Sequence, residues 1–253
     1  MKKKAMPDIQ SAAELKQYYE RLVRHDYLED YIDDTRPDEH ELWLVYSILK
    51  KREPSYRAIA ITLAWGYVHA GLAIHELVSL HNKNDDVSKK RRQLNVLAGD
   101  FYSALYYQSL AGVNAVDMIE LFGSTLQEIY EQKMATYMDK EAPFQERLQQ
   151  SKAIESLLVT SITKKLNITD YDDLIKTFFF YKRLSKDEQE ASEEKISPLR
   201  MSLRNGQISN ASEEDMFREA KQVEWHLIQE KAAEHHDEVG ELVRSLLERD
   251  GGI

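Results

Sequence analysis

A long stretch without formal charge, from Ala58 to His75, constrains the fold of this chain more than any other feature. Its apolar residues are so dense that a helix formed here must be buried on most of its surface. A membrane would also accept such a helix, but a span needs about 20 predominantly apolar residues. This stretch contains Thr62 and His69 as well as His75. We therefore expect a buried central helix and no transmembrane segment.

Helix signals recur along the chain, whereas no strand-like alternation is sustained anywhere. Ser11 and Glu14 form a capping-box pattern before a helix that ends near residue 24. Pro37 suits the first position of a helix that ends near residue 52. Further helices are expected at about 55–81, 91–110, 115–138, 143–166, 170–184, 212–233 and 237–248. The pattern predicts an all-α protein, a bundle of about ten helices.

The chain has 253 residues, with only 9 Gly and 5 Pro, and we expect all of it (1–253) to form a single all-α domain. The core is expected at about 11–184 and the C-terminal helices at about 212–249. A charge-rich stretch at about 185–210 contains Ser197-Pro198 and Asn205-Gly206, and it predicts a flexible connection. Residues 82–90 are almost wholly polar and predict an exposed loop.

Composition excludes several classes of function. Lys and Arg number 34 against 44 Asp and Glu, a net charge of −10, which argues against a nucleic-acid partner. There is no Cys, so disulfides, a cysteine nucleophile and thiolate metal sites are excluded. The basic start runs into polar residues and is unlike a secretory signal, so we expect a cytoplasmic protein.

Three groups of polar residues resemble metal ligands, but each is better explained as an ordinary structural or surface feature. His75 and His81 are six residues apart, about 600° of helical rotation, so they lie on opposed faces and do not form a zinc pair. His235-His236 is expected on a solvated helix face, and Asp85-Asp86 in a polar loop. The sequence predicts no metal site in this chain.

The most informative stretch runs from Val68 to Ala111. An apolar helix ends at His75-Glu76, and a polar loop, Arg91-Arg92 and Gly99-Asp100 follow. This order resembles the trans-prenyl diphosphate synthases. In that family the helix ends in an aspartate-rich motif preceded by His, Arg-Arg follows in the loop, and Gly-Asp begins the next helix. The aspartates hold Mg²⁺ ions that bridge to the allylic diphosphate.

The matching positions of this chain have lost most of those acids. His75 falls on the family's histidine and Glu76 on the first aspartate, but Leu77 and Leu80 fall on the other two. Ile154 stands where catalytic members carry a diphosphate-binding lysine. At the second motif three bases replace three acids, namely Lys182, Arg183 and Lys186. These bases would repel Mg²⁺.

The chain has lost these aspartates but retains Leu-Ala-Gly-Asp-Phe-Tyr and the segment Phe179–Leu184. In this combination it resembles the small subunit (component 1) family of two-component heptaprenyl diphosphate synthases. The resemblance implies a degenerate synthase-like bundle without catalytic residues or cofactor. Its partner would be the large catalytic subunit (component 2), which would hold Mg²⁺. The pair would make an all-trans C35 diphosphate from farnesyl and isopentenyl diphosphates, for menaquinone biosynthesis.

Under that resemblance the candidate site residues fall into three sets. The diphosphate end would comprise His75, Glu76, Arg91, Arg92 and Asp100. A partner contact would comprise Lys182, Arg183 and Lys186, and a wall for the prenyl chain Tyr102, Tyr106 and Phe179. The alternatives are structural: carboxylates that brace helices, aromatic residues in the core and bases at the surface. An alternative function is a stand-alone α-helical module that binds a prenyl or other lipid diphosphate without catalysis.

Overall fold

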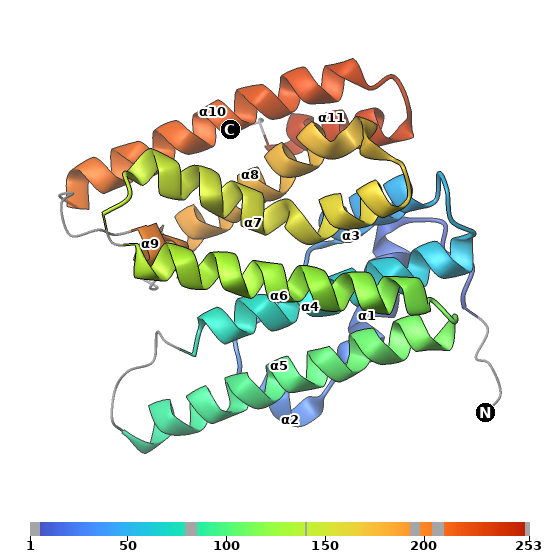
Figure 1. The fold of residues 1–253 in the computed structure, drawn as a ribbon, viewed down its shortest axis with the longest axis horizontal. Helices are drawn as coiled ribbons and strands as arrows, with labels where there is room; N and C mark the ends of the chain where they lie inside the picture. The colour runs from blue at the N-terminus through green and yellow to red at the C-terminus, as the bar shows by residue number, and fades with distance from the viewer. Residues whose placement is uncertain (1–5, 79–84, 140, 193–197, 204–209, 251–253) are drawn as a thin grey trace. The chain divides into compact units, whose positions relative to one another are not determined.

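The computed structural model describes residues 6–78, 85–139, 141–192, 198–203 and 210–250 (Figure 1). These residues form α-helices and one short 3₁₀-helix, Thr169–Tyr171, and no strand occurs among them, which confirms the all-α prediction. The α-helices are α1 Ala12–Val23, α2 Asp26–Glu29, α3 Glu39–Leu49, α4 Ser55–Glu76, α5 Asp86–Gly112, α6 Val116–Met138, α7 Phe144–Lys165, α8 Asp172–Ser192, α9 Pro198–Leu203, α10 Asn210–Glu234 and α11 Glu238–Asp250.

Helix α4 contains the uncharged stretch and is the buried helix that the sequence predicted. Within the described part of the chain it is the one helix long and apolar enough to cross a membrane by length and composition. Of its most apolar window, 78% is buried inside the protein. Core helices of globular proteins meet the same length and composition test, so α4 is weak evidence for a membrane span.

By its internal contacts the chain divides into two compact units, Met1–Glu120 and Leu121–Ile253, which we describe separately. The single domain expected from the sequence stays a prediction. In the first unit α1 packs on α3, α3 on α4, and α4 along α5. The Tyr19 hydroxyl donates to the carbonyl of Gly66 (3.0 Å), and the Thr35 hydroxyl donates to the carbonyl of Ala70 (3.0 Å). Both bonds bring N-terminal residues onto α4.

In the second unit α8 packs between α7 and α10, and α11 returns along α10 (Figure 1). An apolar cluster joins α7, α8 and α10 with α9, and it comprises Phe144, Leu148, Phe180, Leu184, Leu199, Leu203, Phe217 and Ala220. Two ion pairs border it. Lys152 Nζ lies 2.7 Å from Glu224 Oε2, and Arg200 Nε lies 2.7 Å from Asp187 Oδ2. Both carboxylates are almost fully buried.

Several helix ends differ from the predictions, because capping side chains set them. Helix α3 starts at Glu39, since Asp38 and Glu41 form a full capping box, and Pro37 precedes the helix. Helix α5 starts at Asp86, because the Asp85 carboxylate accepts from the Ser88 amide (2.8 Å). The predicted loop at 82–90 therefore ends by residue 85. Residues 185–192, part of the predicted connection at about 185–210, belong to α8, and residues 198–203 form α9.

Candidate functional site

Helices α4 and α5 approach closely where the first degenerate motif lies. A Cβ atom on Gly99 would stand 1.8 Å from His75 Nε2, and one on Gly71 would stand 3.4 Å from Tyr102 Cβ. The absence of a side chain at Gly99 therefore makes room for the imidazole of His75. The histidine and the Gly-Asp pair, which the resemblance brought together at a diphosphate end, do lie side by side.

Arg91-Arg92 and Gly99-Asp100 all lie on α5, as the helix predicted at about 91–110 indicated. In the trans-prenyl diphosphate synthases that the chain resembles, Arg-Arg lies in a loop and Gly-Asp begins the helix, whereas here α5 starts at Asp86 and Gly99 lies in its interior. The reason is local. Asp85 caps the helix, and the following Lys-Lys-Arg-Arg-Gln-Leu favours continuation of the helix.

Arg91 is held by an acid that sequence reasoning did not single out. Its Nη2 donates to Asp33 Oδ1 (2.5 Å), and both side chains keep about two fifths of their surface exposed, at 37% and 40%. Among the described residues, the buried Arg91 Nε has no hydrogen-bond partner. One turn further along α5, Asn95 is fully buried, and its amide nitrogen and oxygen likewise bond to no described residue.

A second charged pair follows Asp33 in the same segment. Arg36 donates to Asp34 through Nε and Nη2, both at 2.7 Å. Partial burial would raise the pKa of Asp34, but the hydrogen bonds from Arg36 outweigh it and lower that pKa. Burial raises the pKa of the nearby Tyr102 to about 12, so this hydroxyl is neutral at physiological pH. The segment from Asp33 to Arg36 is thus held in place by matched charges.

The two acids of the first motif lie in different surroundings. Glu76 is half-buried at the last position of α4. Asp100 is exposed on α5 and, among the described residues, forms no ion pair. Leu77 is the C-cap residue that follows α4, and Leu80 lies outside the described residues. A single carboxylate, with Arg91 and Arg92 on the neighbouring helix, does not fit a Mg²⁺ site, which needs several oxygen ligands.

The three candidates for a prenyl-chain wall are all buried. Tyr102 and Tyr106 are 6% and 4% exposed and belong to the α5 face that packs on α4. Phe179 is 2% exposed in the second unit and stands edge-on to Phe178, with ring centroids 5.3 Å apart. Their burial matches the structural alternative for aromatic residues. A role beside a prenyl chain stays a prediction.

The three bases of the second motif lie together on α8. Lys182, Arg183 and Lys186 are half-buried, and they follow the buried run Phe178–Tyr181. Residues 182 and 186 are one turn apart, so they lie on one side of the helix. Their contact with a partner stays a prediction.

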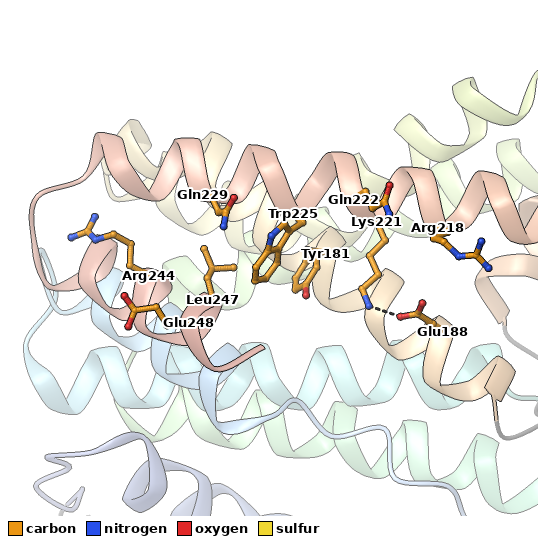
Figure 2. Close-up of a pocket in the computed structure, with 10 residues that line it drawn as sticks. All are labelled: Tyr181, Glu188, Arg218, Lys221, Gln222, Trp225, Gln229, Arg244, Leu247 and Glu248. Carbon is orange, nitrogen blue, oxygen red and sulfur yellow. Dashed lines mark hydrogen bonds and ion pairs between the residues drawn. The ribbon is translucent and has the colours of Figure 1, made fainter. Parts of the chain in front are cut away.

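An open groove of about 830 Å³ lies between α8, α10 and α11, and the sequence did not predict it (Figure 2). The rings of Tyr181 and Trp225 lie against each other in it, with centroids 5.4 Å apart, and Lys221 forms an ion pair with Glu188. Arg244 donates to the carbonyls of Ala232 (2.5 Å) and His235 (2.9 Å), which holds the α10–α11 turn. None of the predicted site residues lines this groove.

The histidine pair near this turn also differs from its prediction. His235 and His236 lie in the connection between α10 and α11 and not on a helix. His235 stacks on Tyr171, with centroids 4.5 Å apart, while His236 is exposed. Within the described ranges no three His, Cys, Asp or Glu side chains are grouped so that they could hold a metal ion.

Comparison with known proteins identifies the family of this chain. Residues 25–237 match the family model described as heptaprenyl diphosphate synthase (HEPPP synthase) subunit 1. A curated relative, heptaprenyl diphosphate synthase component 1 of Geobacillus stearothermophilus, is 32% identical over 108 residues, which are 43% of this chain and 49% of the relative. The match thus spans about half the length of that relative. Because the family model covers most of the chain, this protein belongs to the heptaprenyl diphosphate synthase subunit 1 family.

Proposed function

We propose that this chain is the non-catalytic subunit of a heteromeric heptaprenyl diphosphate synthase. It would act with a large subunit that carries both aspartate-rich motifs and binds Mg²⁺. The pair would extend farnesyl diphosphate with isopentenyl diphosphate to an all-trans C35 product, in the cytoplasm, as a precursor for menaquinone. Membership of the subunit 1 family and the component 1 name of the relative support this proposal.

The proposal rests on the side chains that could bind a metal ion at the first motif, at the end of α4 beside α5. A catalytic synthase needs carboxylates there, because Mg²⁺ must neutralise the diphosphate that leaves. Of the three positions that match the aspartates of the first motif, only position 76 carries a carboxylate, on Glu76, and α5 carries the bases Arg91 and Arg92. At the second motif position the side chains are bases. Chain extension would therefore depend on the partner's carboxylates.

The proposal is tested by reconstitution. The purified chain, farnesyl diphosphate, radiolabelled isopentenyl diphosphate and Mg²⁺ should give no polyprenyl product. Product should form when the large subunit encoded in the same genome is added. A large subunit with alanines in its first aspartate-rich motif is the control, and it should fail with this chain present.

Two results would contradict the proposal. One is Mg²⁺-dependent incorporation by this chain alone, in a preparation free of host synthase. The other is full activity and full product length from the large subunit alone. Calorimetric binding of farnesyl diphosphate to the isolated chain, without any effect on the large subunit, would favour the stand-alone binding module.

A further inference from the structure

The groove between α8, α10 and α11 is large enough for a ligand, and a face of α10 forms one of its walls (Figure 2). Its volume of about 830 Å³ lies within the range of small-molecule sites, about 300–1,000 Å³. Arg218, Gln222, Trp225 and Gln229 follow one another along α10 in steps of four, three and four residues, so they share one side of this helix. All lining residues belong to the second unit.

An aromatic surface lies in the middle of this groove. Trp225 is half-buried, and its ring lies against that of Tyr181, with centroids 5.4 Å apart and planes at 45° (Figure 2). Tyr181 and Leu247 are both 7% exposed, so Trp225 has the more accessible ring of the two aromatic residues. A flat ring of a ligand can stack on an indole that is held in this way.

The lining of the groove carries three bases and two carboxylates, although the whole chain has a net charge of −10. Lys221 and Arg218 stand one and two turns before Trp225 on α10. They pair with Glu188 and Asp215, whose side chains are 51% and 75% exposed. Exposed ion pairs contribute little, so an incoming anion can take the place of these carboxylates. We therefore expect an acidic group beside the two bases.

Two further features limit the chemistry of the ligand. Gln222 and Gln229 are exposed on either side of Trp225 along α10, so their amides can bond to polar groups at the edge of a stacked ring. A prenyl or other alkyl chain has no such groups. Along the helix axis, Lys221 and Arg218 lie about 6 and 10.5 Å from Trp225, at 1.5 Å per residue. The acidic group therefore belongs on a spacer, several ångströms from the ring.

We propose that this groove binds a nucleoside phosphate, with the base stacked on Trp225 and the phosphate beside Lys221 and Arg218. A nucleotide combines a flat ring with polar edges, a sugar as the spacer and a terminal anion. A single nucleotide needs only a local pair of bases, so the acidic net charge that argues against nucleic acid does not oppose it. The inference concerns the second unit alone and is independent of the proposed catalytic partner.

Calorimetric titration of the full chain with the monophosphates of adenosine, guanosine, cytidine and uridine tests the inference. At least one nucleotide should bind with a Kd of about 1 mM or below, and more weakly as the salt concentration rises. Lys221→Gln should weaken this binding about fivefold or more, because it removes a charge-assisted bond to the phosphate. Trp225→Leu should weaken it about tenfold, because it removes the stacking surface.

Each of these variants has a matched control. Lys231→Gln removes another paired lysine of α10, whose side chain is 25% exposed against 27% for Lys221. Trp43→Leu removes another half-buried tryptophan, whose ring centroid lies 5.1 Å from that of Tyr46. Neither control residue lines the groove, so both should leave the Kd within about twofold. Melting temperatures are recorded for all four variants, and Lys221→Gln decides the outcome if Trp225→Leu does not fold.

Loss of nucleotide binding in Lys221→Gln and Trp225→Leu, with both controls unchanged, would establish the site. The inference is overturned if no nucleotide binds at about 5 mM, or if the controls weaken binding as much as the groove variants. Inorganic phosphate that binds as tightly as the nucleotides would reveal an anion patch without a site for the base. Indoleacetate or farnesyl diphosphate that binds where nucleotides do not would assign the groove to an aromatic carboxylate or a prenyl chain, against the inference.

Discussion

The imidazole of His75 lies against α5 at Gly99, where any side chain would collide with it. A Cβ atom at position 99 would stand 1.8 Å from Nε2, far inside van der Waals contact. The glycine thus sets how close the end of α4 comes to α5. The same contact makes the pair of residues a sensitive test of the α4–α5 packing.

Gly99→Ala should lower the free energy of unfolding by about 1–3 kcal/mol, because overpacking forces either the histidine or a helix to move. His75→Ala in the same chain should remove the collision, so a double-mutant cycle should show a coupling of about 1 kcal/mol or more. Gly123→Ala is the control. A Cβ there meets nothing within 4 Å, so alanine should stabilise α6 by about 0.5–1 kcal/mol. Urea unfolding measures the free energy of unfolding of the two single variants, the double variant and the control. If the effects of Gly99→Ala and His75→Ala simply add in the double variant, the contact between the two residues is refuted.

Arg200→Ala should destabilise the second unit by about 3 kcal/mol, since it leaves a buried carboxylate without its guanidinium. Arg200 Nε lies 2.7 Å from Asp187 Oδ2, and the Asp187 side chain is 1% exposed. Arg218→Ala is the matched control, because Arg218 and Asp215 are 57% and 75% exposed, and its cost should stay below about 0.5 kcal/mol. Equal melting temperatures for the two variants would contradict this assignment.

Because of the Asp34–Arg36 pair, the free energy of unfolding should depend on pH in the acidic range. Folding lowers the pKa of Asp34 against the opposing effect of burial, because Arg36 bonds to the ionised form. The stabilisation is therefore present above the ordinary pKa of about 3.9 and is lost as pH falls through the folded value. The unfolding free-energy difference between wild type and Asp34→Asn should shrink from pH 7 to pH 3. In an Arg36→Met background that pH dependence should become smaller, since only the backbone amide of residue 36 still donates to Asp34 (3.0 Å), and an unchanged dependence would exclude the guanidinium as a cause.

Glu76→Gln should change kcat/KM of the reconstituted pair less than about threefold, because the amide keeps the shape and one acceptor of the carboxylate. Melting temperature and affinity for the large subunit are measured alongside. A loss of tenfold or more, about 1.4 kcal/mol of transition-state stabilisation, with both controls unchanged, would give Glu76 a direct share in the active site.

Much of the fold could be predicted because its signals are local. The Ser11 cap accepts from the Glu14 amide (3.3 Å), as the capping pattern indicated. The uncharged stretch is the buried helix α4, since a helix apolar on every side must be surrounded. The loss of acids at Leu77 and Lys182 is likewise visible in the sequence alone. Interactions within one helical turn, and the type of each residue, need no tertiary information.

The tertiary structure decided what the motif residues do with one another. Arg91 pairs with Asp33, 58 positions away in the sequence, and not with Asp100. Asn95 is fully buried although its type is usually exposed, because its face of α5 packs along α4. The exposure of Leu97 and Tyr107 was equally invisible, since helical spacing indicates that a face is apolar but not which element covers it. Pairing over such distances depends on how helices pack, and that packing is set by the whole chain.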